Sequence, residues 1–108
     1  MTETATAREI ALEAKRCLAE AFGSRLKGVV LHGSEARGEA TEDSDIDLLV
    51  LLEGPVSTFK DIGTIVDATY HLELETGRMI DGQPADVQEY EEGAVYLYRL
   101  ALREGVPL

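Results

Sequence analysis

The stretch GSEARGEATEDSDIDLLV, residues 33–50, carries most of the information in this chain. It opens with two small residues, Gly33 and Ser34, and ends with Asp45 and Asp47 at the start of an apolar run. In an extended segment alternate side chains share a face, so the two aspartates project together while Ile46 points into the core. Paired carboxylates on one face can jointly bind Mg²⁺, which prefers oxygen ligands.

The small-residue turn supplies the other half of the pattern. Gly33 and Ser34 allow close approach, and backbone N–H groups of a turn entering a helix can hold phosphate oxygens, with the Ser34 hydroxyl as a further donor. Arg37 pairs with a phosphate or, alternatively, with surface glutamates. Those glutamates are Glu35, Glu39 and Glu42. The stretch therefore predicts a site for a metal-bound triphosphate, arranged for in-line attack by a hydroxyl at the α-phosphorus.

Hydrophobic spacing places this stretch among three helices and three strands. The expected helices are 6–22, with Thr6 and Glu9 as a capping box, 58–76, and a third that contains 94–101. The expected strands are 26–31, 46–52 and 84–88, the last in a region interrupted by Gly82 and Pro84. This order, without repeat or linker, predicts one domain, residues 1–108, of the α/β (α+β) class with a small mixed sheet covered by helices.

Composition limits the partners and the location. With 21 acidic and 10 basic side chains the formal charge is −11, which opposes direct binding to nucleic acid. Cys17 falls in a helical apolar pattern, which predicts a small core residue. As the single cysteine of the chain it cannot form an internal disulfide, which fits a reducing compartment. No secretory signal is evident, and the run Leu48–Leu52 is far shorter than the ~20 residues of a membrane-spanning helix. These features predict a cytoplasmic protein.

The pattern Gly33-Ser34-x-Ala36-Arg37-Gly38, six residues, Asp45-x-Asp47-Leu48 resembles the signature of the DNA polymerase β-type nucleotidyltransferase superfamily, and most of all the minimal nucleotidyltransferases. The resemblance implies the polymerase β-like fold, contacts from Gly33 and Ser34 to the triphosphate, and metal binding by Asp45 and Asp47. His32, just before the turn, is expected to line the pocket.

The same resemblance implies that a third carboxylate arrives from a later strand. Asp86, in the stretch Ala85-Asp86-Val87-Gln88, is the expected residue, and Asp81 is the alternative. In that position Asp86 would share a metal and accept or orient the proton of the attacking hydroxyl.

The leading functional hypothesis is an Mg²⁺-dependent enzyme that moves AMP from ATP, or another nucleoside monophosphate, onto a hydroxyl of a partner protein or small molecule. The resemblance further implies a HEPN-domain protein as partner, in a toxin–antitoxin pair whose antitoxin modifies a tyrosine. The alternative is a non-catalytic module that binds a nucleotide or neutralises a partner by contact. A structural metal-binding domain is a third interpretation, and the glycine–serine turn argues against it.

Overall fold

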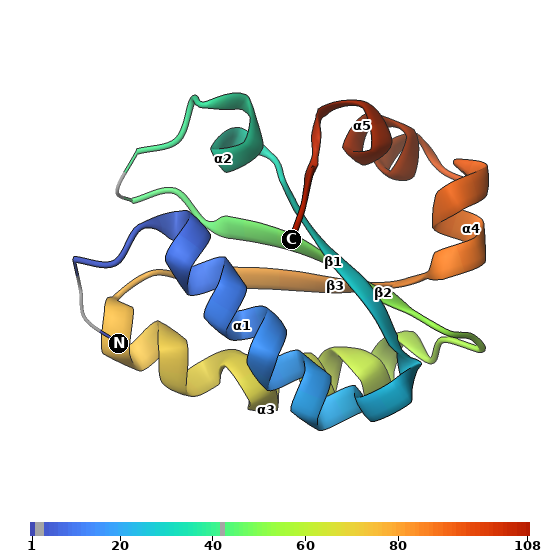
Figure 1. Ribbon diagram of the computed structural model, residues 1–108, viewed down its shortest axis with the longest axis horizontal. Helices are drawn as coiled ribbons and strands as arrows, with labels where there is room; N and C mark the ends of the chain where they lie inside the picture. The colour runs from blue at the N-terminus through green and yellow to red at the C-terminus, as the bar shows by residue number, and fades with distance from the viewer. Residues whose placement is uncertain (2–3, 42) are drawn as a thin grey trace.

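The computed structural model describes residues 1, 4–41 and 43–108, which form one mixed sheet and its covering helices (Figure 1). The sheet has the order β3-β2-β1-β4, with β1 antiparallel to both of its neighbours and β2 parallel to β3. The predicted α+β class with a small mixed sheet is thus confirmed. In chain order the elements are α1 (Ala7–Phe22), η1 (Gly23–Arg25), β1 (Leu26–His32), α2 (Ser34–Arg37), β2 (Ile46–Leu52), α3 (Thr58–Thr76), β3 (Ile80–Asp86), α4 (Val87–Glu92), α5 (Tyr96–Glu104) and β4 (Val106–Pro107).

The early elements begin and end where their local chemistry predicts. Glu9 N donates to Thr6 Oγ1 at 3.1 Å and Thr6 N donates to Glu9 Oε1 at 3.0 Å, so the predicted capping box starts α1. The predictions for 46–52 and 58–76 coincide with β2 and α3. None of the helices in the described part of the chain is long and apolar enough to cross a membrane.

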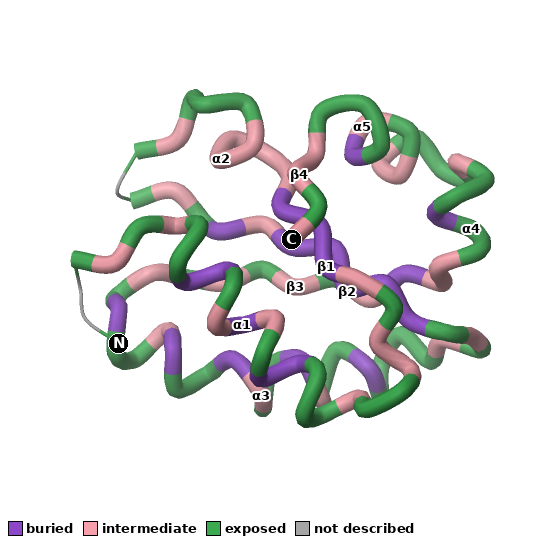
Figure 2. The backbone as a smooth tube through the Cα atoms, viewed as in Figure 1, coloured by how far each residue is buried: buried purple, intermediate pink, exposed green. Residues whose placement is uncertain are grey.

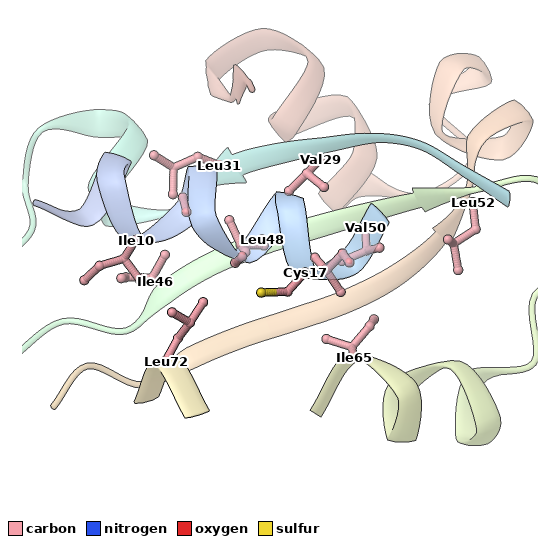
Figure 3. Packing of buried hydrophobic residues seen from close by; sticks show 13 residues of the cluster. Ile10, Cys17, Val29, Leu31, Ile46, Leu48, Val50, Leu52, Ile65 and Leu72 are labelled. Atoms are coloured by element: carbon pink, nitrogen blue, oxygen red, sulfur yellow. The ribbon is translucent and has the colours of Figure 1, made fainter. Parts of the chain in front are cut away.

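Apart from Asp47, the strand β2 is apolar because helices cover both of its faces. Its even-numbered residues, Ile46 to Leu52, pack with β1, α1 and α3 in the larger core cluster (Figure 3), which also contains Cys17. Leu49 and Leu51 point to the other face and pack beneath α4 and α5. Figure 2 shows the buried backbone concentrated along β1 and β2. Asp47 alternates with Leu49, so it lies on the second face, beyond the residues that α4 and α5 bury.

The later elements differ from the sequence-based expectation. The strand predicted at 84–88 is β3, Ile80–Asp86, and residues 87 and 88 already belong to α4. Pro84 is tolerated because β3 is an edge strand, where a missing N–H costs no ladder hydrogen bond. At Gly82 a Cβ would come within 2.6 Å of Ile65 Cγ2, so the absence of a side chain allows α3 to pack on β3. The last helix begins at Tyr96 instead of Ala94, and the short elements α2, α4 and β4 were not predicted.

An ion pair between the partly exposed Arg25 and the buried Asp61 fixes the start of α3. Arg25 donates through Nη1 and Nη2 to the two Asp61 carboxylate oxygens at 3.1 Å each, and Ser57 N donates to Asp61 Oδ2 at 3.0 Å. The Asp61 side chain is only 3% exposed, and the hydrogen bonds from Arg25 are the main reason that its pKa lies below the usual value. The charged form of Asp61 therefore stabilises the fold above the unfolded-state pKa, and this contribution is lost as pH falls through the lower folded-state pKa.

We expect Arg25→Ala to lower the free energy of unfolding by about 2–3 kcal/mol at pH 7, because it leaves a buried carboxylate with one donor. Urea denaturation measures this loss, and the difference from wild type should begin to shrink as pH falls below the unfolded-state pKa of about 4 and disappear below the lower folded-state pKa of Asp61. Arg16→Ala is the control, since the ion pairs of Arg16 with Glu13 and Glu20 are solvent-screened and should contribute little to stability. Equal losses in the two variants would contradict a structural role for the pair of Arg25 and Asp61.

Candidate active site

The end of β1 brings the small-residue turn against the first carboxylates. His32, the last residue of β1, pairs in register with Asp47 on β2. Gly33 follows with φ 72° and ψ −151°, a conformation that is essentially restricted to glycine. A Cβ at Gly33 would overlap the Asp47 carboxylate. The turn that leads into α2 is therefore in direct contact with the functional end of Asp47.

A second carboxylate comes from the neighbouring strand. In the parallel pairing of β2 and β3, Asp47 is in register with Asp81, and neighbouring strands lie about 4.8 Å apart. Asp45 stands immediately before β2, two residues from Asp47. Asp45 and Asp81 are exposed and Asp47 is half-buried. Three carboxylates thus gather at the uncovered end of one sheet face, beside the Gly33 turn.

The electrostatics of this cluster favour a bound cation. Burial, and then the neighbouring charges of Asp81 and Asp45, raise the pKa of Asp47, while His32 opposes this increase. Burial is the main reason that the pKa of His32 is lowered, and the charges of Asp47 and Asp81 act against that decrease. A divalent cation would relieve the repulsion among these carboxylates, and a cluster of oxygen donors suits Mg²⁺.

The carboxylates of this cluster would leave part of a bound metal's coordination free for substrate and water. In the described ranges, which omit residues 2, 3 and 42, no three His, Cys, Asp or Glu side chains stand close enough to enclose a metal by themselves. Mg²⁺ in phosphate-transfer sites is usually held by one or two carboxylates together with substrate phosphates and water. The carboxylates at the ends of β2 and β3 fit that manner of binding.

Asp86 is not part of this cluster, and the prediction that placed it there was wrong. It pairs in register with Leu52, at the opposite end of β2 from Asp47. Its Oδ1 accepts from Gln88 N at 2.9 Å and from Glu89 N at 3.2 Å, so it caps α4. A Cβ at Gly54 would overlap Asp86 Oδ2, which leaves this carboxylate enclosed at the wrong end of the sheet.

The position of Asp81 has a sequence signal that periodicity alone does not reveal. Both strands begin with the same pair, Ile46-Asp47 and Ile80-Asp81, and the structure sets isoleucine beside isoleucine and aspartate beside aspartate. The isoleucine enters the core and the aspartate faces the open side in both strands. Pro84 obscured this match, because it displaced the expected strand toward the C-terminus.

The remaining loop residues take different roles. Arg37 Nε lies 3.4 Å from Glu39 Oε2, one of the alternative surface contacts, and the guanidinium is 38% exposed and can turn toward a ligand. Glu42 lies outside the described residues. Ser44 closes a local turn, since Thr41 N donates to Ser44 Oγ at 2.9 Å and Ser44 N donates to Thr41 O at 3.1 Å. The structural role expected for Ser44 is confirmed.

Gly33→Ala should damage the fold and the site together. The substituted residue would occupy a backbone region that costs roughly 1–3 kcal/mol, and its Cβ would displace Asp47. We expect this loss of unfolding free energy and a loss of MgATP affinity of at least about tenfold. Gly38→Ala is the control, because Gly38 also has positive φ, 73°, but open space around its Cβ position. Urea denaturation and calorimetric titration of both variants measure the two effects, and undiminished MgATP affinity in Gly33→Ala would contradict the site.

A glycine turn packed on paired strand-end carboxylates defines the class of site that binds metal-complexed phosphates, and comparison with known proteins identifies the family. Residues 12–99 match the nucleotidyltransferase domain family. The chain therefore belongs to this family, as its sequence signature predicted.

Individual relatives agree with this assignment. A Methanocaldococcus jannaschii protein named "putative protein adenylyltransferase" is 38% identical over 60 residues, which is 56% of this chain and 54% of the relative. The aligned region thus spans about half of that protein. A solved structure of a "putative minimal nucleotidyltransferase" superposes with a TM-score of 0.61 at 28% identity, covering 97% of this chain and 98% of the other.

Two further structures share the fold at lower sequence identity. A nucleotidyltransferase from Sulfolobus solfataricus, also named "putative", gives a TM-score of 0.62 at 22% identity, covering 94% of this chain and 80% of the other. A chain of a mutant form of the toxin–antitoxin complex MntA–HpeT gives 0.62 at 19% identity, covering 97% and 72%. The fold of the minimal nucleotidyltransferases is therefore established for this chain.

Proposed function

We propose that this nucleotidyltransferase moves AMP from MgATP onto a hydroxyl group of a partner protein. The observation that carries the proposal is the contact between the Gly33 turn and Asp47, with Asp81 in register on the neighbouring strand. This arrangement can hold the triphosphate and its metal at one place, at an exposed end of the sheet that an acceptor can reach. Only a site that joins both elements can align a hydroxyl with the α-phosphorus.

Each residue has a defined part in the proposed chemistry. The Gly33–Ser34 turn binds phosphate oxygens, and Arg37 turns from Glu39 to add a charged donor. Asp47, with Asp45 and Asp81 beside it, would hold the divalent metal together with the triphosphate and water; we propose that this metal is Mg²⁺, which would neutralise charge when bound. Asp81 takes over the role first expected of Asp86, and accepts or orients the proton of the attacking hydroxyl. The new bond joins this oxygen to the α-phosphorus, and pyrophosphate leaves.

The acceptor is proposed from the relatives and from the charge of the chain. The relative named as a protein adenylyltransferase supports a protein acceptor and AMP as the transferred group. The toxin–antitoxin neighbour supports a two-protein system, and we propose a HEPN-domain protein as the partner. The formal charge of −11 disfavours nucleic acid as acceptor. We also propose a cytoplasmic location, where the buried Cys17 thiol would remain reduced.

Label transfer tests the proposed reaction. The chain is incubated with Mg²⁺, the protein encoded beside it, and ATP labelled on either the α- or the γ-phosphate. We expect the partner to acquire the α label and never the γ label. When EDTA is present throughout, the partner should acquire no label. Transfer of the γ label would indicate phosphoryl transfer. Inhibition of the partner without any label would favour neutralisation by contact.

A further inference from the structure

One basic side chain joins the two ends of the loop that runs from Gly33 to Asp45. Arg78 lies in the short link between α3 and β3, far from this loop in sequence. Its Nη2 donates to Glu35 Oε1 at 2.7 Å, and its Nε and Nη2 donate to Ser44 O at 3.2 and 2.9 Å. One guanidinium therefore connects the first turn of α2 with the residue immediately before Asp45.

The contact is sheltered from solvent. The Arg78 and Glu35 side chains are 15% and 17% exposed, much less than Arg37 and Glu39 at 38% and 64%. A charge-assisted pair with this degree of burial holds a fixed geometry better than an exposed pair, which solvent screens. The two ion pairs of the loop are thus unequal: Arg78 is anchored, whereas Arg37 is available to a ligand.

The link that carries Arg78 also touches both metal-site strands. Ile46 N donates to Met79 O at 2.9 Å, and Asp81 follows two residues later. The phosphate-binding turn, the start of β2 and the start of β3 therefore meet around residues 78–81. A shift of the Arg78 side chain would alter the distance between the turn and the carboxylates without touching the core beneath β2.

We propose that Arg78 is a positioning residue, which sets the spacing between the phosphate-binding turn and the metal-binding carboxylates by clamping Glu35 and Ser44. The inference rests on the proposed function of this site. Arginine is required because its planar fork reaches a carboxylate and a carbonyl at once, whereas a lysine ammonium is a point charge on a flexible stem. Nε and Nη2 of Arg78 are already engaged by Ser44 and Glu35, so the proposed role is to position the loop and not to bind the phosphates.

The test combines a structural readout with kinetics in Arg78→Met, Arg78→Lys and Glu35→Gln. Amide hydrogen exchange of residues 34–41 reports the clamp, whether or not the protein proves to be an adenylyltransferase. We expect Arg78→Met to speed this exchange at least about tenfold, while the β2 amides remain as protected as in wild type. Well below the unfolding temperature, kcat should fall about 10²-fold, the cost of a small misplacement in the site.

The other variants separate positioning from direct contact with substrate. Arg78→Lys should not restore kcat, and Arg78→Met with Glu35→Gln should lose no more than Arg78→Met alone, because both act through one clamp. Arg16→Met is the control, since it removes exposed ion pairs on α1. Unchanged exchange of residues 34–41 in Arg78→Met would overturn the clamp, and so would a rise in KM alone, which indicates a substrate contact. Absence of transfer in wild type would instead overturn the proposed function, with the exchange result still deciding the clamp.

Discussion

Asp81→Asn is expected to reduce nucleotidyl transfer about 10²- to 10³-fold while Asp86→Ala leaves it within about twofold of wild type. Asp81 pairs in register with Asp47 across the β2–β3 ladder, so under the proposed function its substitution removes one proposed metal ligand and the proposed acceptor of the hydroxyl proton. General-base catalysis alone contributes roughly 10²- to 10⁴-fold. Because Asp81 is exposed, the asparagine variant should fold normally. Initial rates of α-label transfer at saturating MgATP measure the effect.

For stability the order is reversed: Asp86→Ala should destabilise the protein, whereas Asp81→Asn should not. Asp86 caps α4 by accepting from two backbone N–H groups, and replacing such a cap with alanine costs about 1 kcal/mol. In a domain of this size this corresponds to a decrease in Tm of roughly 4–8 °C. The kinetic assay must therefore be run well below that Tm. Loss of transfer in folded Asp86→Ala, with Asp81→Asn active, would restore the original choice of Asp86 and contradict the site described above.

Asp47→Asn is expected to abolish transfer and yet to stabilise the metal-free protein. Removing a carboxylate that binds metal costs several kcal/mol of charge stabilisation, or roughly 10³-fold in rate. In the absence of metal, burial and the charges of Asp81 and Asp45 disfavour the ionised Asp47, as its raised pKa indicates. A neutral asparagine removes this penalty, so the Tm of the metal-free variant should be a few degrees higher. In a domain of this size, 1 kcal/mol of unfolding free energy corresponds to roughly 4–8 °C in Tm.

The pH dependence of stability follows from the same raised pKa. Between the unfolded-state and the higher folded-state pKa of Asp47, the folded protein binds more protons than the unfolded chain, so this residue lowers stability as pH rises through that interval. Thermal unfolding of wild type and Asp47→Asn from pH 3 to pH 7, without metal, should show the advantage of the variant growing with pH. Mg²⁺ with a non-hydrolysable ATP analogue should then raise the Tm of wild type more than that of the variant. A metal-free variant less stable than wild type at pH 7 would contradict this electrostatic account.

The parts of the structure that were predictable are those in which one local signal dominates. The capping box of Thr6 and Glu9 predicted the start of α1, and the almost continuous apolar run 46–52, broken only by Asp47, predicted a strand covered on both faces. The spacing of Gly33, Asp45 and Asp47 predicted that the turn and the carboxylates lie together, and the structure packs Gly33 against the Asp47 carboxylate. Each of these features depends on residues within about a dozen positions of one another.

The parts that were missed depend on pairing between distant segments. Pro84 is a strand breaker in general but acceptable at a sheet edge, and which strand lies at an edge is decided by the whole sheet. The misplaced strand then favoured Asp86 over Asp81, because a register cannot be read from one strand alone. The contacts of Arg78 with Glu35 and Ser44 span 43 and 34 residues and leave no periodic signal in the sequence.

The most direct test of the central claim is calorimetric titration of Mg²⁺ and a non-hydrolysable ATP analogue into wild type, Asp47→Asn, Asp81→Asn and Asp86→Ala. If the turn and the ends of β2 and β3 form the site, wild type and Asp86→Ala bind the analogue with equal affinity only when Mg²⁺ is present. Asp47→Asn and Asp81→Asn then bind at least about tenfold more weakly. Equal binding by all four proteins, or binding that does not depend on Mg²⁺, would show that the nucleotide is held elsewhere and would contradict the assignment of this site.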